Sequence, residues 1–313
     1  MSTIATSQPM TPSLFKRLIS GHPLLAYFVL AFSGTWLFAL PAVLGKNGLG
    51  LFPFTLPFLL FAVLFVLSSF VGPTLAAFLV TAVTQGKPGV LHLLRRYVQW
   101  RVGIRWYLFV FFGYIVLNLL AASLFLGVAP FLAFFQNWPL LFTSYLPAIL
   151  VFPGIITWGE EPGWRGFALP RLEQKYGPLV GSLILGFLHG VWHLPIFLIA
   201  FFFGPFEPSH LLSFATNTLA IMMITLIWTW VFNNTKGSIL MAVFNHAAFN
   251  ATGTLIAFLV PAPLLGGWLG NAALGVLAVL LLIFTKGRLS YNPKQNAQII
   301  GLPQAAEMPL VQS

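Results

Sequence analysis

Long apolar runs without a charged side chain are the feature that most limits how this chain can fold. A helix needs about 20 predominantly apolar residues to cross the hydrocarbon core of a bilayer, and eight stretches reach about that length without Lys, Arg or Glu. The runs are continuous rather than strictly alternating, which argues against the strands of a membrane β-barrel and leaves helices as the spanning structure. The expected spans are residues 24–44, 58–83, 106–126, 140–158, 179–203, 211–232, 238–260 and 264–284.

The composition agrees with a membrane protein. Hydrophobic residues make up 58% of the 313 positions and charged residues 6%, whereas soluble domains carry about 25% charged residues. A soluble globular enzyme and a disordered protein are both excluded. The sequence has no Cys and no Asp, which excludes disulfides, a thiolate metal site, a cysteine nucleophile and a protease built on paired aspartates. We therefore expect an all-α integral membrane protein, an eight-helix transmembrane bundle.

The basic residues predict the orientation of this bundle. With the N-terminus inside, fourteen of the fifteen Lys and Arg residues fall on the cytoplasmic side and only Lys46 falls outside, as the positive-inside rule requires. The chain is thus predicted to be a multi-pass protein of the cell membrane with both termini cytoplasmic. Its net charge of +10 then reflects loops near anionic lipid in the bilayer, and no nucleic-acid partner is expected.

The predicted organisation is one membrane domain over residues 21–285, between cytoplasmic tails at 1–20 and 286–313. The extreme residues of both tails, 1–15 and 289–313, are polar and are predicted to be poorly ordered.

Two local features modify the spans. Gly72-Pro73 predicts a kink in the second span. Residues 86–105 are basic and partly amphipathic, so they are predicted to lie on the cytoplasmic interface with arginines toward headgroups; a plain charged loop that fixes topology is the alternative.

Ionisable side chains at membrane depth are costly, so they are candidates for function. His189, His193 and His246 lie inside expected spans, and Glu160 and Glu161 lie where the fourth span meets the cytoplasm. Three pairs have the i, i+4 spacing that places both side chains on one helix face: Glu161 with Arg165, His189 with His193, and His246 with Asn250. These polar stripes are predicted to line one cavity that opens to the cytoplasm.

Structural explanations exist for each of these residues. The glutamates could be a loop pair, and Pro162 predicts a kinked or restarted helix after them. A transmembrane histidine or Asn250 could bind a neighbouring helix. The charges at 171, 173 and 175 are interpreted as ordinary loop charges.

Two motifs of known hydrolases are missing from the sequence. The sequence has no His-Glu-x-x-His helix and no Gly-x-Ser-x-Gly elbow. Glutamate with histidine remains, either as a general-base pair or as metal ligands.

Three motifs together resemble a known family. Glu160-Glu161-Pro-Gly-Trp-Arg165 matches the Glu-Glu-x-x-x-Arg motif of the CPBP intramembrane proteases, which include the type II CAAX prenyl endopeptidases. His189-Gly-Val-Trp-His193 is similar to the second motif, Phe-x-x-x-His, with His189 in place of Phe, and His246-Ala-Ala-Phe-Asn250 matches the third, His-x-x-x-Asn. The resemblance covers roughly residues 20–285, in the expected order and on the fourth, fifth and seventh spans.

The resemblance implies peptide hydrolysis in the membrane by a CPBP-type intramembrane metalloendopeptidase. In this family pattern Glu160 and His193 activate a water molecule, and His246 and Asn250 stabilise the oxyanion. Glu161 and Arg165 act as a supporting pair.

A cofactor and a substrate class also follow from the resemblance. Zinc is implied as a cofactor, with Glu160, His193 and His246 as its ligands and an open position for water. The substrate is expected to be a membrane-associated peptide or protein. Two other classes stay open: a non-proteolytic protein that binds a partner, of the bacteriocin-immunity type, and a transporter, although no inverted repeat is visible.

Overall fold

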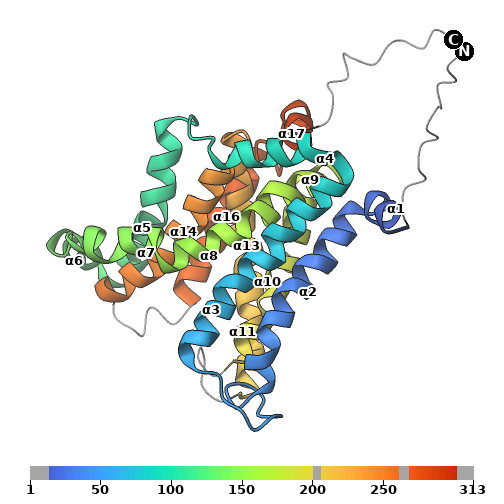
Figure 1. Cartoon of the computed structure of the whole chain (residues 1–313). Helices are drawn as coiled ribbons and strands as arrows, with labels where there is room; N and C mark the ends of the chain where they lie inside the picture. The colour runs from blue at the N-terminus through green and yellow to red at the C-terminus, as the bar shows by residue number, and fades with distance from the viewer. Residues whose placement is uncertain (1–13, 200–205, 261–267, 302–313) are drawn as a thin grey trace, which may run out of the picture.

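The computed structural model describes residues 14–199, 206–260 and 268–301. The regular structure of these residues is entirely helical, which confirms the predicted all-α class. Figure 1 shows the helices gathered into one bundle. The segments are α1 (Leu14–Gly21), α2 (Pro23–Leu44), α3 (Phe58–Ser69), η1 (Phe70–Thr74), α4 (Leu75–Tyr97), α5 (Ile104–Leu126), α6 (Ala129–Gln136), η2 (Leu141–Tyr145), α7 (Leu146–Leu150), α8 (Phe152–Glu161), η3 (Pro162–Ala168), α9 (Leu169–Tyr176), α10 (Pro178–Trp192), α11 (Leu194–Phe197), α13 (Ser209–Asn234), α14 (Ile239–Leu259), α16 (Trp268–Thr285) and α17 (Pro293–Ile300).

Seven helical segments of the described residues are long and apolar enough to cross a membrane. The expected last span corresponds to α16, whose apolar part, Leu269–Thr285, is shorter than the others. The first residues of that expected span, and the end of the expected span at 179–203, lie outside the described residues. The bundle is therefore confirmed, and the count of eight stays a prediction.

Small residues allow the central helices to approach closely. A Cβ atom added at Gly186 on α10 would lie 2.7 Å from Met222 Cα on α13, and one at Gly190 would lie 2.9 Å from Thr218 Cα. Without water to drive helix association, such close packing is a main source of stability in a bilayer. It holds the histidine-bearing end of α10 firmly against α13.

Two π-helical turns bring α2, η1 and η3 together. At Gly72-Pro73, where a kink was predicted, the structure has η1. At Pro162, where a kinked or restarted helix was predicted, η3 continues α8 without leaving helical backbone. A Cβ atom at Gly163 would lie 2.5 Å from both Pro73 O and Tyr27 Oη. Only glycine permits this approach, which packs the turn after Glu161 against two other helices. Single π-helical turns inside helices occur frequently at functional sites.

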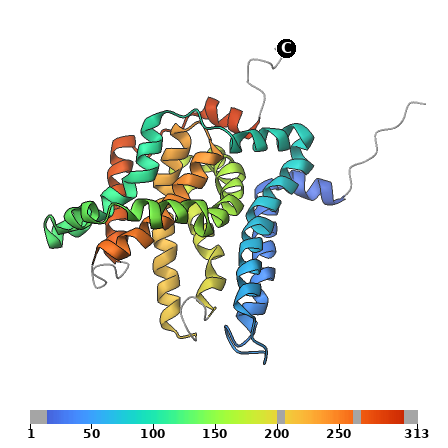
Figure 2. The same cartoon turned by 60° about the vertical axis from the view of Figure 1, so that its left-hand side comes forward.

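The basic stretch at 86–105 begins with a kink in α4. Gly86 has a φ of 66°, which is not helical, so the residues after it run in a different direction from the span before it. Residues 87–97 then run across the end of the bundle (Figure 2). Leu91 and Leu94 on this part are exposed, as expected for a helix at an interface.

Arg96 departs from the prediction that the arginines point to headgroups. It is buried, and its guanidinium donates hydrogen bonds to the carbonyls of Gly237, Gly166 and Ile299 at 2.8, 2.8 and 3.3 Å. A guanidinium satisfies several carbonyls at once because its five N–H groups fan out in one plane.

The tail was predicted to be poorly ordered from residue 289 onward, but residues 293–300 of it form α17. Ile299 and Ile300 are buried, and Asn296 donates to Pro170 O at 2.8 Å. Residues 302–313 and 1–13 lie outside the described residues. The short polar helix folds because it can bury two isoleucines against the bundle.

Glu173 is also not an ordinary loop charge. It is 1% exposed and accepts a hydrogen bond from Asn233 Nδ2 at 2.7 Å. In the sequence Glu173 stands between two basic residues, which is typical of a solvated loop. In the folded protein Asn233 and the segment that leads to α17 cover it.

Candidate active site

The acidic end of α8 supplies two carboxylates to the interior of the bundle. Glu160 and Glu161 are the last residues of α8, and both are buried, with 3% and 1% of their surface exposed. Two buried carboxylates side by side are costly unless charged or hydrogen-bonding groups compensate them. Their partners therefore define the site.

Glu161 is compensated on two sides. Its Oε1 accepts a hydrogen bond from Arg165 Nη1 at 2.8 Å and another from His246 Nδ1 at 2.8 Å. The i, i+4 pairing expected from the sequence is therefore present, although the intervening segment is π-helical. Glu161 links the fourth and seventh expected spans.

Trp228 on α13 covers this ion pair. Its ring lies 4.4 Å from the guanidinium carbon of Arg165 and 4.5 Å from the ring of His246. Thr225, one turn earlier, accepts a hydrogen bond from Arg165 Nη2 at 3.4 Å. These two residues were not found from the sequence, because Thr and Trp on an apolar helix give no signal of their own.

Glu160 is paired with the residue that departs from the family motif. Nε2 of His189 lies 3.0 Å from Glu160 Oε2, and both side chains are buried. His193 lies next to His189, with ring centroids 5.0 Å apart. Its Nδ1 donates a hydrogen bond to the carbonyl of His189 at 2.8 Å, which leaves Nε2 as the nitrogen with a free lone pair.

Ligand atoms of Glu160, His189 and His193 all lie within 4.8 Å of one another. This group differs from the predicted zinc set, in which His246 took the place of His189. His246 instead directs its Nδ1 to Glu161. The described residues thus contain a possible metal-binding group made of one carboxylate and two imidazoles.

Aromatic side chains enclose the glutamate–histidine cluster. Trp164 packs 4.9 Å from the ring of His189, and Trp192 packs 4.8 Å from the ring of His193. Tyr27 on α2 closes the other side of Trp164, with ring centroids 5.8 Å apart. The Tyr27 hydroxyl and the indole N–H groups of both tryptophans are buried without a hydrogen-bond partner among the described residues. Buried donors of this kind normally bind a water molecule or a ligand oxygen.

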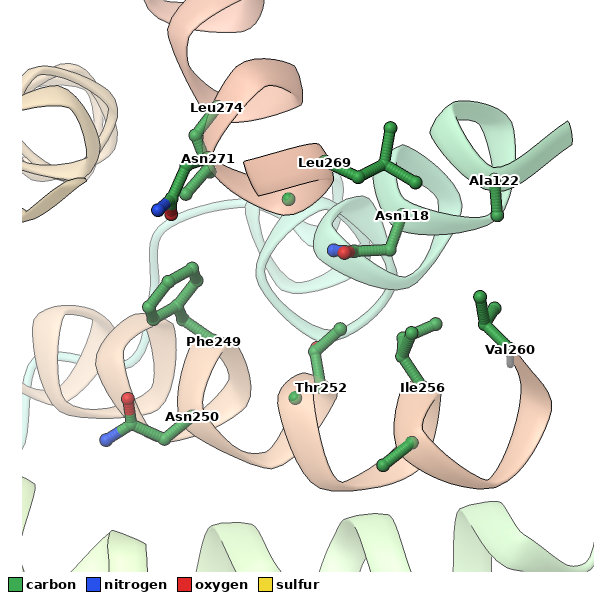
Figure 3. Close-up of a pocket in the computed structure, with 13 residues that line it drawn as sticks. Asn118, Ala122, Phe249, Asn250, Thr252, Ile256, Val260, Leu269, Asn271 and Leu274 are labelled. Carbon is green, nitrogen blue, oxygen red and sulfur yellow. The ribbon is translucent and has the colours of Figure 1, made fainter. Parts of the chain in front are cut away.

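Asn250 lies one turn beyond His246 on α14, and its side chain is exposed. It lines a cavity of about 380 Å³ between α5, α14 and α16, together with Asn118 and Asn271 (Figure 3). Within the described part of the chain, no hydrogen bond joins the Asn250 amide to the glutamate–histidine cluster. The structure therefore groups five of the six predicted site residues, whereas Asn250 lines the cavity between α5, α14 and α16.

The fold and this cluster define an all-helical membrane protein with a buried glutamate–histidine site. Residues 139–252 match the family described as type II CAAX prenyl endopeptidase Rce1-like. The match contains all three sequence motifs and supports the resemblance: over this segment the chain is similar to the type II CAAX prenyl endopeptidases.

A particular relative is the CAAX prenyl protease 2 of Methanococcus maripaludis. It is 27% identical to this chain over 118 residues, which are 37% of this chain. The matched part spans 42% of the length of that relative.

Proposed function

We propose that this protein is an intramembrane endopeptidase that hydrolyses a peptide bond in a membrane-associated peptide or protein. The observation that carries this proposal is the meeting of Glu160, His189 and His193 within 4.8 Å, beside the Glu161–Arg165–His246 chain. A protein that only binds a partner, or a transporter, has no need of a carboxylate and imidazoles placed in this way.

Glu160 is the proposed general base. His189 Nε2–H donates to Oε2 of Glu160, so the other carboxylate oxygen is left to accept a proton from water. The hydroxide equivalent then adds to the carbonyl carbon of the scissile peptide, and the proton passes to the departing amine. A positioned acid–base group of this kind contributes about 10²–10⁴-fold to the rate.

His193 has the proton arrangement needed to help in this step. Its Nδ1–H is held by the carbonyl of His189, and Nε2 can accept a hydrogen bond from the same water. The sequence-based assignment of Glu160 and His193 to water activation is therefore retained in the proposal, and His189 is added as the residue that orients Glu160.

His246 and Asn250 are the proposed oxyanion donors. Because Glu161 accepts from Nδ1 of His246, the imidazole can donate to an oxyanion through Nε2 only when both ring nitrogens carry a proton. Asn250, one turn further along the same helix, would donate through its amide once substrate is bound. Removal of one such donor typically costs about 10²–10³ in turnover.

As an alternative to this metal-free water activation, Glu160, His189 and His193 would fit a divalent metal as ligands, with zinc as the first candidate. One carboxylate with two imidazoles is a donor set of catalytic zinc sites. The bond from His193 Nδ1 to a backbone carbonyl is the kind of outer contact that orients a ligating histidine, and His189 Nδ1 is a buried atom without a partner. When bound, such an ion acts as a Lewis acid toward the scissile carbonyl and toward water.

The experiment is a cleavage assay with purified protein and membrane-anchored peptides, with and without a lipid-like chain. Wild type should cleave at least one of them, and Glu160→Gln should not. If wild-type protein in a bilayer left every peptide of a broad library intact, with and without added zinc, the protease proposal would be wrong.

A further inference from the structure

A second polar cavity lies at the basic end of the bundle, away from the glutamate–histidine site. It has a volume of about 690 Å³, is open to the surface and is lined by the α1–α2 junction, α4, α9 and the end of α17. Figure 1 shows these helices gathered at the same end of the molecule. Its polar lining includes His22, Thr84, Gln85, Arg171, Gln174 and Lys175.

The charge of this cavity is entirely positive. Arg171 and Lys175 lie one turn apart on α9, and no acidic residue is among the lining side chains. The nearest carboxylate along the chain, Glu173, is buried and held by Asn233. The two cations are therefore not neutralised by a lining residue.

Arg171 is held in place before any ligand binds. Its Nη1 donates to the carbonyl of Phe167 at 2.9 Å, and its guanidinium carbon lies 3.8 Å from the centre of the Phe167 ring. A guanidinium fixed by stacking retains further N–H groups for an oxyanion, and its planar fork suits phosphate.

The first turn of α2 opens on the same cavity. This 22-residue helix begins at Pro23, and the preceding His22 makes no side-chain capping bond. The first N–H groups of a helix lack intrahelical partners, and the positive end of its dipole favours an anion. This feature adds to the two cations rather than standing alone.

The cavity lies where two candidate spans end, which is the level at which lipid headgroups are expected. One candidate span begins at Pro23 and another ends at Tyr176, so the cavity is level with the ends of two spans. Leu25 on α2, which lines the cavity, is 63% exposed, and Leu18 on the adjoining α1 is 59% exposed. A ligand with a phosphate in the cavity can therefore lay acyl chains along an apolar surface.

We propose that this cavity binds the phosphate of an anionic membrane lipid. The apolar surface next to the cationic lining favours a lipid over a soluble phosphate, because each methylene of an acyl chain that it buries adds to binding. Basic pockets between transmembrane helices are known to take such headgroups. The lipid would bridge α1, α2 and α9, the last of which continues from η3 and the candidate active site.

The test is native mass spectrometry of the full chain in detergent, titrated with phosphatidylglycerol, phosphatidylcholine or glycerol phosphate. Wild type should retain one phosphatidylglycerol in preference to phosphatidylcholine. Lys175→Gln and Arg171→Gln should each weaken that binding about fivefold, the usual effect of one cation near a membrane surface. Lys175 is exposed, so its variant should fold even if the Arg171 variant does not.

Arg95→Gln and Arg101→Gln are the matched controls. Both arginines are exposed at the same end and do not line the cavity, so their variants should bind like wild type. Equal losses in the control and cavity variants would mean general surface attraction and would overturn the proposal. Equal retention of phosphatidylcholine would do the same, and displacement of lipid by equimolar glycerol phosphate would show a soluble-phosphate site instead.

Discussion

His189 Nε2 lies 3.0 Å from Glu160 Oε2, with both side chains buried. The family motif has Phe at the position of His189, so this contact replaces an apolar neighbour of the proposed base with a polar one. Glu160 therefore has a hydrogen-bond donor of its own, whereas Glu161 shares Arg165 and His246. The two adjacent carboxylates differ in their partners, and the predictions below separate their roles.

Glu160→Gln should reduce peptide hydrolysis by about 10²-fold or more, because the amide cannot accept a proton from water. The shape of the side chain is kept, and a buried charge is removed, so the thermal stability should not fall. Turnover of a cleaved peptide and the melting temperature should be measured together. Glu207→Gln, at an exposed position, is the control; a Glu160 variant as active as this control would reassign the base to Glu161.

Arg165→Ala and Glu161→Gln should both destabilise the protein. Removing one member of a buried ion pair typically costs about 3–5 kcal/mol, since the other charge is left uncompensated. The free energy of unfolding can be measured by denaturant titration in mixed micelles. The double variant Glu161→Gln/Arg165→Met should recover part of this loss, and losses that simply add would contradict the coupling.

Zinc content should depend on His189. Purified wild type should carry about one equivalent of zinc, and His189→Phe and His193→Ala should lose it. The control His210→Ala, in the first turn of α13, should retain its zinc. Metal is counted by elemental analysis of the folded protein, independently of activity.

His246→Ala decides between the two ligand sets. The structure-based set predicts that this variant keeps its zinc, since His246 is bound to Glu161. Loss of zinc from the His246 variant together with retention in His189→Phe would restore the set proposed from the sequence.

Arg96→Leu should lower the free energy of unfolding by about 3 kcal/mol. The substitution removes three hydrogen bonds from a charged donor to the carbonyls of Gly166, Gly237 and Ile299. Such a bond is worth about 1.5–3 kcal/mol, and water that reaches the freed carbonyls replaces part of this energy. Arg95→Leu, at the neighbouring exposed position, is the control. Equal stability of the two variants would show that the buried guanidinium is dispensable.

Topology is testable with reporter fusions. Fusions after Lys46 and within 127–139, 204–210 and 261–263 should report an external location, and fusions at both termini an internal one, because of the distribution of Lys and Arg. An external signal from residues 159–178 would contradict both the orientation and the proposed access to the site.

The sequence by itself determined the class of fold and most of the site. Uncharged runs of about 20 residues have to be buried in lipid as helices, because backbone groups find no other partners there. The i, i+4 spacing of Glu161 with Arg165 was sufficient to predict their ion pair, since this pairing depends only on local helix geometry.

Only the tertiary structure decided which side chains meet across helices. The tertiary structure determines the partners of Glu160, the separation of Asn250 from the cluster, the burial of Arg96 and Glu173, and the docking of α17. All of these depend on how the π-helical turns and glycines pack neighbouring helices together. Periodicity gives the face of a helix on which a residue lies, but not the rotation and depth of the helix that it faces. For this reason His189 stood in the sequence as a departure from a motif, and in the folded protein it is the hydrogen-bond partner of the proposed base.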